Sequence, residues 1–194
     1  ARSLDAGAFP ADPVVVLLRR QPPRLQGADD LVSERAAEAI ALVGGDAEAG
    51  RIGAVTASVR ALDRSALAVQ GPPGTGKTYL AARVIAYLVE HQGWSIGVVA
   101  QSHRFVENVL SGVVSAGLPA GLVGKATQRG ASAADIAALP FTALRSGGQA
   151  AFLAGHQRAG RGAVIGGTAW DFSNADRVGR QQLDLLVVDE AGQF

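Results

Sequence analysis

One short segment rich in glycine and proline constrains this chain more than any other feature. Its residues are Gly71, Pro72, Pro73, Gly74, Thr75, Gly76, Lys77 and Thr78. It lies between an apolar run at 66–69 and a helical pattern at 77–91. Glycines let successive backbone N–H groups turn inward, and the start of a helix adds partial positive charge, so the segment suits a phosphate group. It therefore predicts a phosphate-binding loop, with a chance glycine turn as the alternative.

The side chains at the end of this loop have separate expected tasks. Lys77 can reach the β- and γ-phosphates of a nucleotide, and Thr78 can offer its hydroxyl to Mg²⁺. We therefore expect ATP and Mg²⁺ as the cofactors.

A second short segment carries two adjacent carboxylates. The apolar run 185–188 predicts a buried strand, and Asp189 and Glu190 follow it directly. Ligands of open α/β sheets bind at the carboxyl ends of the strands, so we expect this pair beside the phosphate loop. Asp189 would hold Mg²⁺ and Glu190 would polarise the attacking water. The alternative is an ordinary charged strand terminus.

Apolar strand patterns alternate with helical patterns over much of the chain. The expected strands are 66–69, 96–100, 163–166 and 185–188, and the expected helices are 31–43, 47–62, 77–91 and 103–116. This alternation predicts an α/β fold, with a parallel sheet covered by helices on both faces.

Two stretches fit this alternation poorly. Between 119 and 162 we expect an irregular insertion or an elaborated crossover, with short helices at 133–139 and 149–156. Near the start, the run 14–18 suggests a strand within an entry segment rich in proline.

Composition excludes several classes of protein. The absence of cysteine excludes disulfides and thiolate metal sites, and it fits a cytoplasmic location. The longest apolar runs are too short to span a bilayer, so we expect no membrane partner. The net charge of +1 argues neither for nor against nucleic acid as a partner. Residues 101–182, however, carry eight Arg or Lys against four Asp or Glu. A solvated surface also explains that mild excess.

The chain resembles superfamily 1 helicases, in the branch with Gly-Pro-Pro-Gly-Thr-Gly-Lys-Thr and Asp-Glu-Ala-x-Gln. Four blocks carry the resemblance, in the family's order: 70–78, 99–108, 164–168 and 189–193. The first and fourth are specific, and the other two are weak alone. The sequences of these blocks are similar to those of bacterial proteins in which such a helicase follows a RecB-like nuclease module.

The resemblance implies further functional residues. Ser102, His103 and Thr168 would contact the phosphates of a single nucleic-acid strand, with DNA favoured over RNA, and Gln193 would sense the γ-phosphate. Each has a structural alternative. Ser102 could cap its helix, Thr168 could satisfy a strand end, and His103 could be an ordinary surface residue.

The resemblance also implies a domain plan: a leading segment or preceding-domain tail at 1–45, and a first RecA-like ATPase domain at 46–194, truncated after the acidic motif. Activity would need a second RecA-like domain that supplies arginines, so we expect the fragment to be nearly inactive alone.

Three positions depart from the family's pattern. His103 replaces the usual Asn and Gln101 the usual Pro, and Arg51 stands where the family reads adenine with Gln. Selectivity for adenine is therefore unsupported. An AAA-type ATPase that remodels proteins is the alternative function, because that class shares the same phosphate loop; a nucleotide-binding module without turnover is a third.

Overall fold

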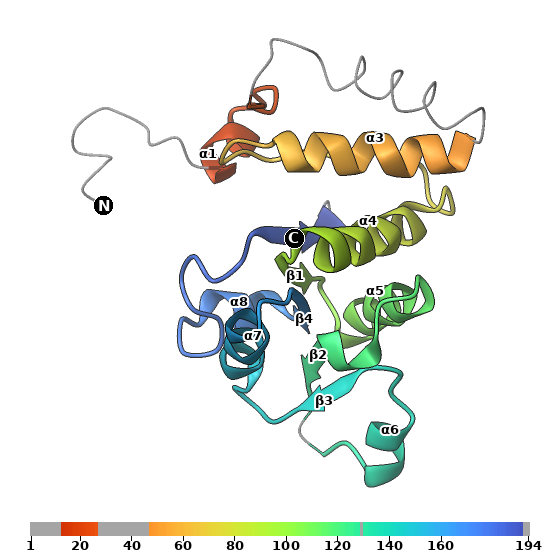
Figure 1. Cartoon of the computed structure of the whole chain (residues 1–194), viewed down its shortest axis with the longest axis vertical. Helices are drawn as coiled ribbons and strands as arrows, with labels where there is room; N and C mark the ends of the chain where they lie inside the picture. The colour runs from red at the N-terminus through yellow and green to blue at the C-terminus, as the bar shows by residue number, and fades with distance from the viewer. Residues whose placement is uncertain (1–12, 27–46, 129, 192–194) are drawn as a thin grey trace, which may run out of the picture. The chain divides into compact units, whose positions relative to one another are not determined.

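The structure, a computed structural model, describes residues 13–26, 47–128 and 130–191 (Figure 1). The chain divides into two compact units, residues 1–77 and 78–194, and each is described by itself. The helix expected at 31–43 lies outside the described residues. No helix in the described ranges has the length and apolar character that a membrane span requires.

In its described residues, 13–26 and 47–77, the first unit has two helices and a short antiparallel contact. Helix α1 spans Pro13–Leu18 and α3 spans Ala47–Ala61. Leu25 and Leu62 form an isolated antiparallel bridge, and the backbone N–H of Arg24 donates to the Ser65 hydroxyl over 3.0 Å. The segment before the phosphate loop is thereby tied to the chain that precedes α3.

Two expected strands in this unit are wrong. The run 14–18 is helical, because Pro13 presets a helical φ at the first helical position, and no strand among the described residues pairs with it. Residues 66–69 have no strand partner among the described residues, and Val69 is 48% exposed. In both places apolar and β-branched residues suggested a strand, but β-propensity is realised only where neighbouring strands pair and pack.

The second unit is built on a five-stranded parallel sheet with the strand order β3-β2-β4-β1-β5. The strands are β1 (Ser95–Val99), β2 (Val123–Ala126), β3 (Thr142–Leu144), β4 (Ala163–Gly167) and β5 (Leu185–Val188). Strands β1 and β4 are buried along their whole length, so they read as continuous apolar runs, whereas β5 alternates between half-buried and exposed residues.

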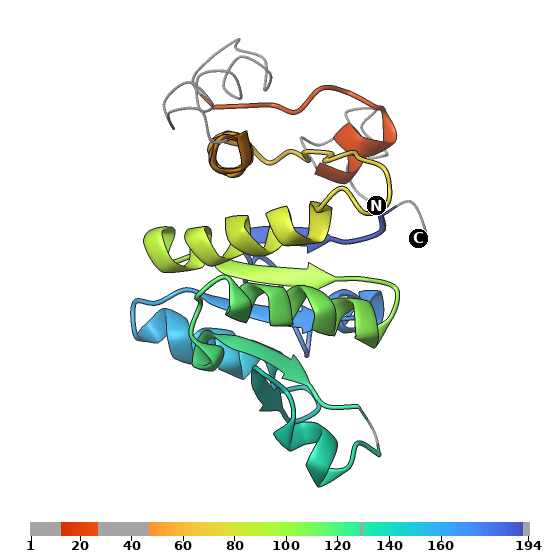
Figure 2. The same ribbon diagram turned by 90° about the vertical axis from the view of Figure 1, so that its right-hand side faces the viewer.

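Helices cover both faces of the sheet (Figure 2). The helical elements of this unit are α4 (Lys77–Gln92), α5 (His103–Ser115), the 3-10 turn η1 (Ala120–Leu122), α6 (Ala133–Ala137), α7 (Gln149–Arg158) and α8 (Ala169–Ser173), and of these α6 has no buried residue. A methyl group at Gly166 of β4 would meet Val106 and Leu110 of α5. One at Gly97 of β1 would meet Phe172 of α8. Because Val98, not Gly97, is paired with Gly166, these two glycines face opposite sides, and so α5 and α8 lie on opposite faces.

The α/β fold class predicted from the sequence is confirmed, and the main helices and strands of this unit end within two residues of their expected bounds. The stretch 119–162 holds more regular structure than expected. It contributes β2 and β3 to the sheet as well as α6 and α7. Gly124 and Lys125 interrupt β2, and β3 is only three residues long, so neither strand has the apolar run that identifies a buried strand.

Candidate functional site

The predicted phosphate loop curls over its own backbone. Gly74 and Gly76 have φ angles of +79° and +81°, a conformation that side chains beyond glycine rarely adopt. The Thr75 hydroxyl donates to the Pro72 carbonyl over 2.8 Å, and a methyl group at Gly71 would lie 2.7 Å from that hydroxyl. The turn therefore depends on glycine at three positions, and residues 72–76 are exposed.

Lys77 begins α4 and its ammonium group folds back over the loop. Its Nζ donates to the Gly71 carbonyl over 2.8 Å and to the Pro72 carbonyl over 3.0 Å. An ammonium has three N–H donors, so one remains for a further acceptor. A lysine ammonium, glycine N–H groups and the start of a 16-residue helix are together the donor set that a nucleotide phosphate requires. The residues present fit that ligand.

The acidic pair lies at the carboxyl end of β5. The Asp189 N–H donates to the Val99 carbonyl over 2.9 Å, which extends the β5–β1 ladder by one residue. Glu190 has φ +53°, an uncommon conformation for a residue other than glycine, and its N–H donates to the Asp189 carboxylate over 3.1 Å. Strained backbone of this kind clusters at functional sites, which agrees with a role for the pair.

The donor chemistry of these residues also suits Mg²⁺. The described part of the chain has no cluster of three or more His, Cys, Asp or Glu that could hold a metal alone. Magnesium bound with a nucleotide needs only one or two protein oxygen ligands beside phosphates and waters, and the Thr78 hydroxyl and Asp189 carboxylate are such ligands. Residues 71–77 of the phosphate loop belong to the first unit, and Thr78 and the acidic pair belong to the second. Gln193 lies outside the described residues.

Ser102 and Thr168 each begin a helix. Ser102 is the N-cap of α5, and its hydroxyl oxygen accepts from the Phe105 N–H over 3.4 Å. Thr168 precedes α8, and both its N–H and its hydroxyl donate to the Asp171 carboxylate over 2.9 Å. The capping alternative considered for Ser102 therefore describes its present contact, whereas Thr168, whose alternative was to satisfy a strand end, bonds to Asp171 at the start of α8.

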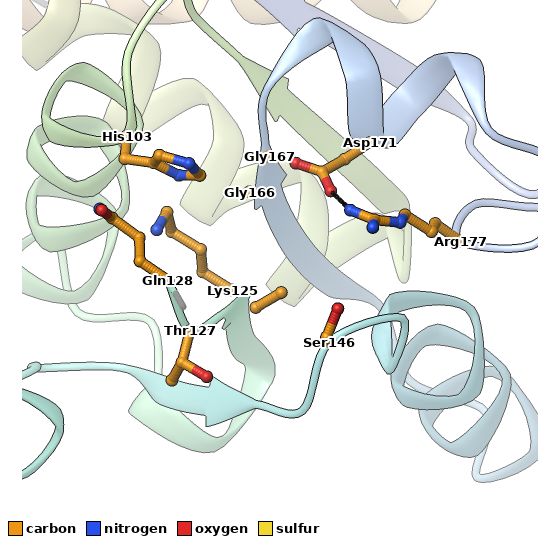
Figure 3. Close-up of a pocket in the computed structure, with 10 residues that line it drawn as sticks. His103, Lys125, Thr127, Gln128, Ser146, Gly166, Gly167, Asp171 and Arg177 are labelled. Atoms are coloured by element: carbon orange, nitrogen blue, oxygen red, sulfur yellow. Dashed lines mark hydrogen bonds and ion pairs between the residues drawn. The ribbon is translucent and has the colours of Figure 1, made fainter. Parts of the chain in front are cut away.

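His103 lines an open pocket of about 240 Å³ at the carboxyl end of the sheet (Figure 3). The pocket lies where the chain leaves β1 for α5 on one face and leaves β4 for α8 on the other. A crevice between connections that diverge in this way is the usual ligand site of an open α/β sheet. Its lining residues are His103, Lys125, Ala126, Thr127, Gln128, Ser146, Gly166, Gly167, Asp171 and Arg177.

Two ion pairs flank this pocket. Lys125, only 3% exposed, donates to the Glu107 carboxylate over 3.0 Å. On the other side the Arg177 guanidinium donates to the Asp171 carboxylate (Figure 3). Burial alone would raise the pKa of Asp171, but the Thr168 N–H, Arg177 and the Thr168 hydroxyl outweigh it and hold the pKa below its ordinary value.

His103 is the titratable residue between these pairs. Its Nδ1 is buried and has no hydrogen-bond partner among the described residues. Burial lowers the pKa of His103 and the Lys125 charge lowers it further, while Asp171 and Glu107 oppose this shift in part. The imidazole is therefore neutral at pH 7, with a buried nitrogen still able to take a partner.

Sequence reasoning identified His103 but missed the pocket around it. Lys125, Gln128, Ser146, Asp171 and Arg177 come from four separate stretches and form no contiguous motif. One signal was available. Lys125 is one of only two lysines in the chain and stands in a stretch with no other charged residue from 108 to 124, which is unusual for a residue that is rarely buried without a partner.

The sequence matches a protein-family model. A family model described as an AAA domain matches residues 53–194, which is more than half of the chain and includes the phosphate loop and the acidic pair. No curated protein and no solved structure shows a significant match. With the parallel α/β fold, this match indicates a nucleotide-binding domain. The chain belongs to this AAA domain family of P-loop NTPases.

Proposed function

We propose that this protein is a nucleic-acid-dependent ATPase, a helicase or translocase that couples hydrolysis of Mg²⁺-ATP to movement along a single strand. The observation that carries the proposal is the pocket at the carboxyl end of the sheet. It brings His103, from the block similar to the family's strand-binding block, together with polar side chains suited to a phosphodiester backbone.

At the nucleotide, each residue would act on a separate part of the reaction. Lys77 would neutralise charge on the β- and γ-phosphates, and Thr78 and Asp189 are the residues that would hold Mg²⁺. Glu190 accepts a proton from the attacking water. Gln193 senses the γ-phosphate, and a second RecA-like domain would supply the arginines that complete the site.

At the strand, the present hydrogen bonds distinguish the three candidate contacts. The Ser102 hydroxyl accepts a bond from Phe105, so its own hydrogen can donate to a phosphate. The Thr168 hydroxyl already donates its hydrogen to the Asp171 carboxylate, so Thr168 would act by positioning the start of α8. His103 can offer its unpartnered nitrogen, and the Gln128 amide and Ser146 hydroxyl line the same pocket.

An AAA-type ATPase that remodels proteins is the second candidate. The family match, described only as an AAA domain, favours it as much as it favours a motor on nucleic acid. A protein-remodelling ATPase has no need of a phosphate-binding pocket at the sheet edge, so stimulation by a strand separates the two.

The decisive measurement is ATP hydrolysis by the full-length parent protein with and without single-stranded DNA or RNA. Lys77→Ala is the blank, because it removes the loop's ammonium. We expect hydrolysis that depends on Lys77 and rises strongly with one of the two strands. Hydrolysis that depends on Lys77 but ignores both strands would favour the protein-remodelling ATPase.

The same assay tests the strand pocket with a pair of histidines. His103→Ala should raise the strand concentration needed for half-maximal stimulation. His91→Ala is the matched control, because His91 lies near the end of α4, is exposed and stacks on Tyr87 rather than lining the pocket. Equal effects of the two substitutions would count against the pocket as the strand site.

A further inference from the structure

The chain has two tryptophans, and they lie at opposite ends of the sheet. Trp94 directly precedes β1 and is half-buried; its N–H donates to the Leu88 carbonyl over 3.3 Å, and its own carbonyl accepts from the Ala163 N–H over 3.2 Å. Trp170 follows β4 at the carboxyl end, as the second residue of α8, and is 73% exposed. Only one of the two is therefore on the side of the pocket.

The neighbours of Trp170 hold its side chain outward. Asp171 is 6% exposed and bonds to Thr168 and Arg177, and Phe172 packs against β1 at Gly97. Because these two residues fix which sides of α8 face the pocket and the sheet, Trp170 cannot turn into the core. An indole combines a large apolar face with a polar N–H, so an exposed tryptophan beside a pocket is suited to contact a ligand.

A second exposed aromatic residue begins the helix on the other face. Phe105, in the first turn of α5, is 42% exposed and directly follows exposed Arg104. His103 of the same turn and Asp171 of α8 both line the pocket (Figure 3). Each side of the pocket thus has an exposed aromatic residue one or two positions from a lining residue.

The sequence around these residues is positively charged. Residues 101–182 carry eight Arg or Lys against four Asp or Glu. Exposed aromatic rings beside polar phosphate-binding groups on a cationic stretch are the pattern used to hold single strands, whose unpaired bases can stack on side chains. A base pair within a duplex has no free face to offer.

We propose that Trp170, with Phe105 on the opposite side of the pocket, stacks on bases of a single nucleic-acid strand whose backbone contacts the pocket. The inference rests on the proposed function and adds to it. It assigns the selectivity for single-stranded over duplex nucleic acid to the first turns of α5 and α8. It also predicts little preference for base sequence.

The two tryptophans make the test internally controlled. The chain is titrated with oligo(dT) and its fluorescence recorded for Trp94→Phe, which keeps only Trp170, and for Trp170→Phe, which keeps only Trp94. Stacking on a base quenches indole fluorescence. We therefore expect the fluorescence of Trp94→Phe to fall on titration and that of Trp170→Phe to change little. Binding of both variants is measured separately by anisotropy of a labelled strand.

Affinity provides the second readout. Trp170→Ala should weaken single-strand binding by about 5- to 150-fold, while Trp170→Phe, which keeps a ring, should bind nearly as the parent does. The dependence of binding on salt should be the same in Trp170→Ala as in the parent, because no phosphate contact is removed. His103→Ala, in contrast, should reduce that dependence.

The outcomes separate this inference from the proposed function. Strand binding with parental affinity in Trp170→Ala, or an unquenched Trp94→Phe that still binds, overturns the stacking role and leaves the motor proposal intact. Failure of the parent chain to bind any strand overturns both. A stronger effect on duplex than on single strand also contradicts stacking.

Discussion

The predicted phosphate loop and the pocket lined by His103, which we propose as the nucleic-acid site, are built in opposite ways. The loop is one contiguous segment whose function depends on backbone geometry and on a single ammonium, that of Lys77. The pocket is assembled from separate stretches of chain, and its two cations are each bonded to a carboxylate. A contiguous site is vulnerable at one residue, whereas an assembled site spreads its binding energy over many. The four predictions below test this contrast, from the largest expected effect to the smallest.

The largest effect is expected at the loop. Lys77→Ala should lower the rate of ATP hydrolysis in the full-length protein by about 100- to 1000-fold, because one preorganised donor to the developing charge is lost. Steady-state hydrolysis measures it, and thermal unfolding serves as the control for folding. A loss of under tenfold would show that the loop does not depend on its one ammonium.

The next largest effect concerns the buried lysine. Glu107→Ala should destabilise the fold by about 2–3 kcal/mol, because it leaves the Lys125 ammonium buried without its partner. The double variant Glu107→Ala, Lys125→Met should recover most of that loss, since it removes the buried charge as well. Urea unfolding gives both values. A double variant less stable than the single one would contradict the interpretation.

On the other side of the pocket, Asp171→Ala should cost about 2 kcal/mol, because the Thr168 N–H and Arg177 lose their acceptor. Asp176→Ala, at an exposed residue of the same loop, should change stability by less than about 0.5 kcal/mol.

The pKa of Asp171 adds a dependence on pH. It lies below its ordinary value in the folded chain, so the stabilisation is present above about pH 4 and is lost as pH falls through the folded pKa. Acid unfolding that is identical in the parent and in Asp171→Ala would exclude this contribution.

The smallest effect is the pH dependence of strand binding. Because burial and Lys125 lower the pKa of His103, the pocket is least cationic near pH 7 and gains charge as pH falls. We expect strand affinity to rise as pH falls below about 6.5 in the parent and in His91→Ala, but not in His103→Ala. The fold itself should lose stability below about pH 6.5, since the unfolded chain then binds that proton more tightly.

The sequence predicted the parts of the molecule that local pattern determines. The bounds of α4, α5 and β5 follow from apolar periodicity and from the residues that begin the helices, and the phosphate loop follows from its glycines. The run 14–18 was misread, because a strand needs a neighbour that local sequence cannot supply. Strands β2 and β3 were missed, since Gly124, Lys125 and a three-residue length leave no apolar run.

The pocket lined by His103 could not be predicted from local sequence patterns. Lys125, Ser146 and Arg177 carry no motif, and only the order of strands in the sheet brings them to one edge. Thr168 was expected to face a phosphate, but its hydroxyl donates to Asp171, a bond that the spacing of three residues alone does not reveal.

The close packing of α5 and α8 on the sheet has a practical consequence. Gly166 and Gly97 allow contact with one helix each, and an added methyl group would lie 2.5 Å from Val106 or 2.6 Å from Phe172. An alanine at either glycine would push α5 or α8 away from its face of the sheet, and no charged or aromatic side chain would be replaced. The gap between Phe105 and Trp170 could thus be widened from either side. The separation of α5 and α8 and the chemistry of their exposed side chains could then be varied independently.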